Sequence, residues 1–68
     1  MDYTVNAQRI KKERIIKGLT MREVAHKAGI SYTSIYQLEK GQNKPQPKTI
    51  RKICDVLGIR TEEVYHFS

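Results

Sequence analysis

Polar side chains suited to hydrogen bonding gather on one face of a short helix predicted after residue 31. At ~100° per residue, Ile35 and Leu38 define the buried side of this helix. The opposite side and the helix start carry Tyr32, Thr33, Tyr36 and Gln37. The Gln37 amide can pair through two hydrogen bonds with adenine, and Thr33 can offer its methyl to thymine or its hydroxyl to a base or phosphate. These four residues are our candidates for contacts with nucleic-acid bases.

The two tyrosines have a less definite part in this chemistry. Each ring can pack on a sugar or on a thymine methyl group and direct its hydroxyl to phosphate. Alternatively, Tyr32 or Tyr36 leans on a neighbouring helix and contacts no ligand. Both interpretations stay open from the sequence.

Positive charge accompanies these polar residues. The 68 residues include 13 Lys and Arg against 7 Asp and Glu, which gives a formal net charge of +6. Between residues 40 and 52 there is no acid, and the basic residues are Lys40, Lys44, Lys48, Arg51 and Lys52. Such an excess suits a polyanionic partner, although basic ribosomal and membrane-surface proteins show it too, and a run of charge is often only a solvated face.

Helix starts are marked by capping residues and helix ends by glycines. The expected N-caps are Asn6, Thr20, Ser31 and Thr61, and Pro47 suits the first turn of a fourth helix. The expected ends are Gly18, Gly29, Gly41 and Gly58. These start and stop signals predict four helices and a last short helical turn. No stretch alternates apolar and polar residues long enough to indicate a strand, so we expect an all-α fold.

Residues 20–40 have the spacing of two helices joined by a tight turn. Thr20 and Glu23 form a capping box at the start of the first. Ala25 lies four positions before Gly29, and a second helix that crosses steeply requires a small side chain there. Gly29 accepts the positive φ that the turn needs. The pattern therefore predicts a helix-turn-helix.

This segment resembles the helix-turn-helix of Cro/CI-type (lambda-repressor-like, XRE-like) transcriptional regulators. Three further matches extend the resemblance over nearly the whole chain: Ile10 with Arg14, Glu39-Lys-Gly41 followed by Pro45, and Ile50 to Leu57 with Gly58-Ile59. The resemblance implies a compact five-helix DNA-binding domain. We expect one domain over residues 1–68, with its core in 6–66 and the helix-turn-helix in 20–40, and the third helix in the DNA major groove.

The resemblance also implies contacts with the DNA backbone and one structural ion pair. In the family, the second helix points its N-terminus at phosphate, where free amides and the helix dipole favour an anion, and the loop after the third helix follows the backbone. The expected phosphate contacts are Thr20, Met21, Arg22, Ser31, Lys40, Gln42, Asn43 and Lys44. Arg14 and Glu39 are expected to pair, because a guanidinium meets a carboxylate through two hydrogen bonds.

Other kinds of site have little support. The single cysteine, Cys54, cannot form an intrachain disulfide, and its spacing from His26 and His66 matches no zinc pattern. We interpret it as a small core residue. No catalytic set can be placed in a cleft that short helices would form. We therefore expect no enzyme activity, metal, cofactor or small-molecule ligand. The chain lacks an apolar run of ~20 residues and a signal peptide, which predicts a cytoplasmic protein without membrane contact.

We expect a sequence-specific DNA-binding transcriptional regulator, a repressor that binds a pseudo-palindromic operator as a homodimer. One recognition helix spans too few base pairs to mark a unique site, so two copies are needed. The apolar residues after the fourth helix are Ile59, Val64, Tyr65 and Phe67. Part of this surface must close the core, and the rest can meet a second copy in a dimer that is weak without DNA.

Two alternatives remain. The chain could be an antitoxin-type autoregulator of a toxin–antitoxin operon, or a co-activator-like adaptor that uses the same fold to bind protein. The sequence names neither the operator nor the regulated genes.

Overall fold

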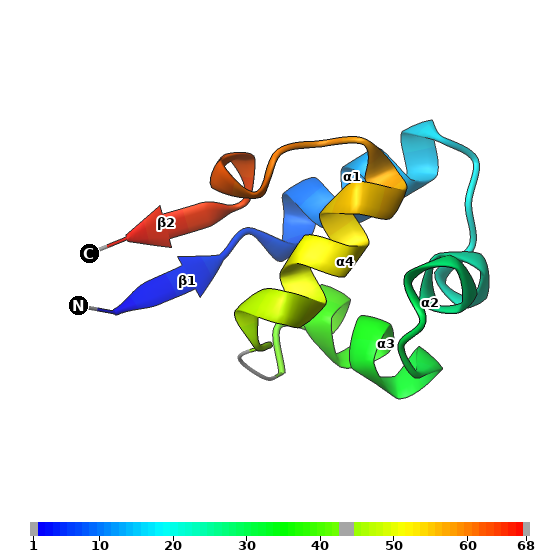
Figure 1. Ribbon diagram of the computed structural model, residues 1–68, viewed down its shortest axis with the longest axis horizontal. Coiled ribbons are helices and arrows are strands. Elements are labelled where there is room, and N and C mark those ends of the chain that lie inside the picture. Colours follow the sequence, from blue (N-terminus) through cyan, green and yellow to red (C-terminus); the bar gives the residue numbers. More distant parts are fainter. Residues whose placement is uncertain (1, 43–44, 68) are drawn as a thin grey trace.

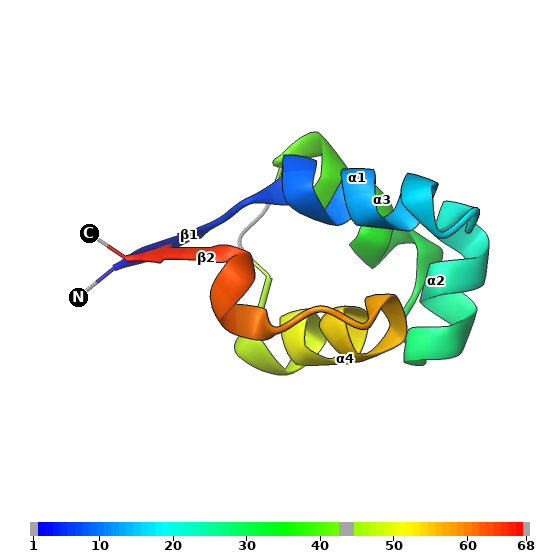
Figure 2. The same cartoon turned by 90° about the horizontal axis from the view of Figure 1, so that it is seen from above.

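The computed structural model describes residues 2–42 and 45–67, in which four α-helices are joined to a small two-stranded sheet (Figure 1). The helices are α1 (Ala7–Ile16), α2 (Met21–Ala28), α3 (Tyr32–Lys40) and α4 (Pro47–Leu57). One turn of 3-10 helix, η1 (Thr61–Glu63), follows α4. The strands are β1 (Tyr3–Val5) and β2 (Tyr65–Phe67), which Figures 1 and 2 show side by side, projecting beyond the helices at one end.

The fold is mostly helical, as expected, but the expected count of five helices and the absence of strands were wrong. The last helical turn is a 3-10 turn whose N-cap is Arg60 rather than Thr61. The chain then enters β2, which pairs antiparallel with β1 so that Tyr3 faces Phe67 and Val5 faces Tyr65. Each strand has only three residues, too few for an alternating pattern to stand out in the sequence.

The helix starts follow the predicted caps. Asn6 Oδ1 accepts the amide of Arg9 at 3.0 Å. The Thr20 hydroxyl accepts the amide of Glu23 at 3.1 Å, and the Glu23 carboxylate accepts the amide of Thr20 at 2.8 Å, which completes the capping box. Ser31 caps α3, and Pro47 is the first residue of α4. These caps use amide donors that a helix start otherwise leaves unsatisfied.

The core is formed by apolar side chains from every helix and from the residue after η1. Its buried members are Ile10, Val24, Ala25, Ile35, Leu38, Ile50, Ile53, Cys54, Leu57 and Val64. Cys54 is a core residue, as expected, and burial raises the pKa of its thiol to about 11. Val64 closes the core from the C-terminal side, while its carbonyl accepts the amide of Asn6 at 2.7 Å and so joins the two ends of the chain.

A largely buried ion pair ties α1 to α3. Arg14 Nε donates to Glu39 Oε2 at 2.7 Å and Nη2 donates to Oε1 at 2.9 Å. Nη1 donates to the carbonyl of Leu19 at 2.8 Å, in the segment between α1 and α2. The side chains of Arg14 and Glu39 are only 12% and 5% exposed. One guanidinium therefore positions three parts of the domain relative to one another.

We expect Arg14→Ala to destabilise the domain strongly. The substitution leaves the Glu39 carboxylate buried and unpaired, and breaking a buried pair in this way costs about 3–5 kcal/mol. A chain of this size has a free energy of unfolding of roughly 3–10 kcal/mol, so much of the fold's stability would be lost. Thermal or urea unfolding followed by circular dichroism measures the change.

Arg51→Ala is the matched control. Arg51 pairs with Asp55 at 3.5 Å, but these side chains are 73% and 69% exposed. Water screens such a pair, so the free energy of unfolding should change by no more than about 0.5 kcal/mol. Equal effects of the two substitutions would contradict the structural importance of the Arg14 pair.

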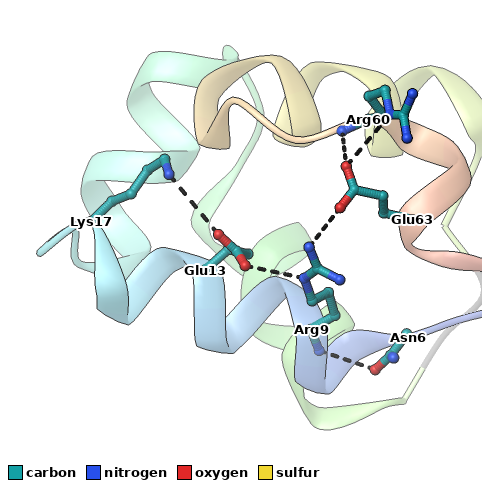
Figure 3. Close-up of polar contacts among 6 residues, drawn as sticks. All are labelled: Asn6, Arg9, Glu13, Lys17, Arg60 and Glu63. Carbon is teal, nitrogen blue, oxygen red and sulfur yellow. Dashed lines mark hydrogen bonds and ion pairs between the residues drawn. The ribbon is translucent and has the colours of Figure 1, made fainter.

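A second ion-pair network joins α1 to η1 (Figure 3). Arg9 donates to Glu13 at 3.1 Å and to Glu63 at 2.6 Å. Lys17 lies 3.9 Å from Glu13, and Glu63 also accepts the amide of Arg60 at 3.0 Å. Arg9 thus contacts a residue that lies 54 positions further along the sequence. These contacts hold η1, and with it the start of β2, against α1.

Acid should weaken this connection through Glu63. The hydrogen bond from the Arg60 amide, followed by that from Arg9, lowers the pKa of Glu63. A carboxyl group whose pKa is lowered in the folded state stabilises the fold above its ordinary pKa, and this contribution disappears as pH falls through the lowered value. We therefore expect the melting temperature of Glu63→Gln to fall less than that of wild type between pH 7 and pH 3. Glu62 is an exposed neighbour, so Glu62→Gln should behave like wild type. Equal acid sensitivity of all three proteins would refute the role of Glu63.

Candidate nucleic-acid interface

The helix-turn-helix forms because α2 and α3 bury their apolar sides against the same core. Val24 and Ala25 of α2 are buried, as are Ile35 and Leu38 of α3. Gly29 ends α2 with a φ of +71°, and the amide of the next residue donates back to the carbonyl of Ala25 at 3.0 Å. Figure 1 shows α3 at the lower edge of the molecule. The side of α3 away from the core is therefore accessible to a large ligand.

The four predicted base-contact residues differ in exposure. Tyr32 and Tyr36 are 37% and 38% exposed, and Thr33 is exposed. Gln37 is half-buried. On a helix these positions share one side, since they are separated by one, three, four or five residues. The structure thus brings a threonine and two aromatic rings to the surface of α3, with the glutamine lying deeper.

Two cations cover the two aromatic rings. The guanidinium carbon of Arg22 lies 4.7 Å from the Tyr32 ring centroid, and the Lys40 ammonium lies 5.6 Å from the Tyr36 ring. The rings are 6.1 Å apart at an interplanar angle of 31°. We call Arg22, Tyr32, Tyr36 and Lys40 the cation–tyrosine ladder. Tyr32 therefore contacts a residue of the neighbouring helix α2. More than a third of its surface is nevertheless accessible.

Sequence reasoning named the four ladder residues but missed their stacking. The spacing of positions 32, 36 and 40 places these side chains one above the other on α3, which is a signal for the Tyr36–Lys40 contact. The contact between Arg22 and Tyr32 joins two helices. It depends on the crossing of α2 and α3, which the sequence does not specify to the required accuracy.

Three of the predicted phosphate-contact residues lie at the start of α2. The capping box already uses the Thr20 amide, which donates to the Glu23 carboxylate, and this bond, together with one from the Thr20 side chain, lowers the pKa of Glu23. Glu23 is consequently a negative charge beside the proposed anion site. Met21 is half-buried against the core, so only its backbone amide can face a phosphate. Arg22 is exposed and carries the positive charge of this helix start.

The remaining predicted phosphate contacts surround α3. The Ser31 hydroxyl accepts the amide of Ser34 at 3.1 Å and lies 2.9 Å from the Ser34 hydroxyl, so it can donate outward when Ser34 donates to it. Lys40 is exposed at the end of α3. Gln42 is exposed, and its amide donates to the Gln37 carbonyl at 3.0 Å. Asn43 and Lys44 lie outside the described residues.

Among residues 2–42 and 45–67, no group of three or more His, Cys, Asp or Glu residues is arranged to hold a metal ion. None of the helices described has the length and apolar character needed to cross a bilayer.

Comparison with known proteins links this geometry to a family. The chain matches the family described as helix-turn-helix over residues 10–64. It is 32% identical over 57 residues to an uncharacterized HTH-type transcriptional regulator from Methanocaldococcus jannaschii, a match that covers 84% of this chain and 86% of that protein. The residues matched by the family include the whole of α2 and α3.

Solved structures agree with the family match. The SinR–SinI complex contains a chain with a TM-score of 0.82 and 29% identity, and the match covers 85% of this chain and 57% of that one. SinR in complex with DNA gives a TM-score of 0.77 and 32% identity, with 82% of this chain and 90% of that one covered. The chain belongs to the helix-turn-helix family of XRE/Cro-like DNA-binding transcriptional regulators.

Proposed function

We propose that this protein is a repressor that binds a pseudo-palindromic operator as a homodimer, with α3 in the major groove. The observation that carries the proposal is the outer side of α3, where Thr33 and two tyrosines are accessible between the cations Arg22 and Lys40. A polar face flanked by positive charge suits a groove whose edges are lined with phosphates. The SinR structure with DNA supports the proposal through a similar fold. Occupation of an operator would exclude other proteins from the same DNA.

In this proposal the bases are read by Tyr32, Thr33, Tyr36 and Gln37. Thr33 contacts a thymine methyl group or donates to a base. Gln37 pairs with the edge of an adenine that faces it in the major groove. A cation covers one face of each tyrosine ring, so DNA would contact the remaining part of the ring or its hydroxyl group.

The DNA backbone is held by the residues around this face. Arg22 and Lys40 contribute side-chain charge, and Met21 contributes its backbone amide. Thr20, Ser31 and Gln42 contribute neutral hydrogen bonds. Asn43 and Lys44 are proposed from the sequence resemblance alone.

Fluorescence anisotropy with duplexes selected from a random pool tests DNA binding. Each phosphate contact changes the slope of log affinity against log salt by about −0.9, so affinity should fall by orders of magnitude between low and moderate salt. Thr33→Ala and Gln37→Ala should weaken binding to the selected duplex by about 1–3 kcal/mol and leave binding to an unrelated duplex nearly unchanged.

Gln8→Ala is the matched control for Gln37→Ala, since Gln8 is an exposed glutamine on α1. It should bind both duplexes as wild type does. If the Gln37 variant lost both kinds of binding equally, Gln37 would position the protein and would not read a base. Binding that hardly responded to salt would favour the protein-adaptor function instead.

The proposed dimer surface is the aromatic side of the two-stranded sheet. Alternate residues of a strand share a face, so Tyr3, Tyr65 and Phe67 lie together. Their ring centroids are separated by 5.4 Å for Tyr3–Tyr65 and 5.6 Å for Tyr65–Phe67. Phe67 is 58% exposed. An isolated two-stranded sheet is only marginally stable in water, and apolar contact with a second copy would stabilise it.

Phe67→Ser should therefore weaken the dimer. Sedimentation of the wild-type complex should show two protomers per operator, with half-site centres about 10–11 base pairs apart and recognition helices about 34 Å apart. The variant should require a higher protein concentration to place two protomers on the same DNA, while its melting temperature stays near that of wild type. One wild-type protomer on an operator without symmetry would defeat the dimer proposal and leave DNA binding itself in place.

A further inference from the structure

We propose that Tyr32 and Tyr36 act as positioning residues for DNA-backbone binding, holding Arg22 and Lys40 against phosphates on the two sides of α3. The inference rests on the proposed function and deepens it. It assigns the ring faces a role separate from base contacts. The ring of Tyr32 holds the Arg22 guanidinium at 4.7 Å, and the ring of Tyr36 holds the Lys40 ammonium at 5.6 Å.

The charges of Arg22 and Lys40 are available for a ligand. In the described part of the chain, no ion pair joins either residue to a carboxylate, whereas Arg9, Arg14 and Arg60 each contact a glutamate. Both residues are exposed. A cation over an aromatic face is attracted to the ring yet keeps its full charge. The ladder therefore orders two cations without neutralising them.

The ladder also spaces these cations along the recognition helix. Tyr32 is the first residue of α3 and Lys40 is the last. At 1.5 Å per residue these positions are about 12 Å apart along the helix axis. Arg22 joins the first position from α2, so one cation flanks each end of the face that carries Thr33. Phosphates on both sides of a bound groove can then be reached without moving the helix.

Restricting the Arg22 and Lys40 side chains before DNA binds should raise the affinity for DNA. Long cationic side chains have the largest rotamer freedom, and they lose it when a phosphate immobilises them. A ring that already restricts the side chain reduces this loss. The ring centroids of the two tyrosines are 6.1 Å apart, so each ring limits the movement of the other. Arg22 and Lys40 are consequently coupled through the rings.

Substitution of Tyr36 by Phe and by Leu separates the ring from its hydroxyl group. Tyr36→Phe keeps the ring that holds Lys40, so its binding to an unrelated duplex should stay within about twofold of wild type, and any loss confined to the operator would belong to base contact by the hydroxyl group. Tyr36→Leu should weaken binding to both duplexes by about 2- to 10-fold, the range expected from ordering one long side chain. Anisotropy titrations measure these affinities, and melting curves verify that each variant is folded.

A double-substitution cycle tests whether the ring acts through Lys40. In a Lys40→Gln background, Tyr36→Leu should have little further effect on binding to the unrelated duplex. In the free wild-type protein, ring currents should shift the side-chain protons of Lys40 upfield in NMR spectra, and Tyr36→Leu should abolish the shift. The same experiments apply to Tyr32 with Arg22→Gln.

The outcomes separate the two proposals. An equal loss of binding to the unrelated duplex in Tyr36→Phe and Tyr36→Leu would assign the effect to the hydroxyl group and overturn the positioning role. An undiminished effect of Tyr36→Leu on binding to the unrelated duplex in the Lys40→Gln background would mean that the ring acts independently of Lys40, and would also overturn the positioning role. In both cases salt-dependent operator binding by wild type would still support the proposed function. Wild-type protein that bound no duplex would overturn both proposals.

Discussion

The orientation of α3 on the rest of the domain depends on one ion pair. Arg14 of α1 bonds both carboxylate oxygens of Glu39 in α3, and it also bonds the Leu19 carbonyl just before α2. Apolar packing is not directional and tolerates small rotations of one helix on another, whereas two charged hydrogen bonds from one planar group permit few. The pair therefore determines how α3 is oriented on the core, and with it the direction in which Thr33 faces. Its largely buried position makes it costly to break from either side.

The cations of this domain have two different surroundings. Arg9 and Arg14 contact glutamates and connect α1 to η1 and α3. Arg22 and Lys40 instead lie over tyrosine rings. A carboxylate partner stabilises the fold but cancels the charge that a phosphate would meet, whereas an aromatic ring leaves that charge unchanged. The cations that stabilise the fold through glutamates are thus different residues from the two that we propose to bind phosphate.

The sequence predicted what depends on local chemistry and missed what depends on distant parts of the chain. The caps at Asn6, Thr20 and Ser31 were correct because each cap is decided by a few adjacent residues. The pairing of β1 with β2 was not predicted, because two three-residue strands meet only after the helices have brought the chain ends together. The stacking of Arg22 on Tyr32 was missed for a similar reason, since the crossing of two helices determines it.

The start of α2 has to satisfy two opposed requirements. The Glu23 carboxylate completes the capping box and so stabilises a helix of only eight residues. The same carboxylate places a negative charge beside the amides that would attract a phosphate, and its lowered pKa keeps it ionised. The helix dipole alone is therefore a weak anion site here, since its effect is confined to the first turn and opposed by that charge. In the proposed complex, attraction of the DNA backbone at this end of α3 would therefore come chiefly from the Arg22 side chain, and the Tyr32 ring that holds it would contribute to the interface.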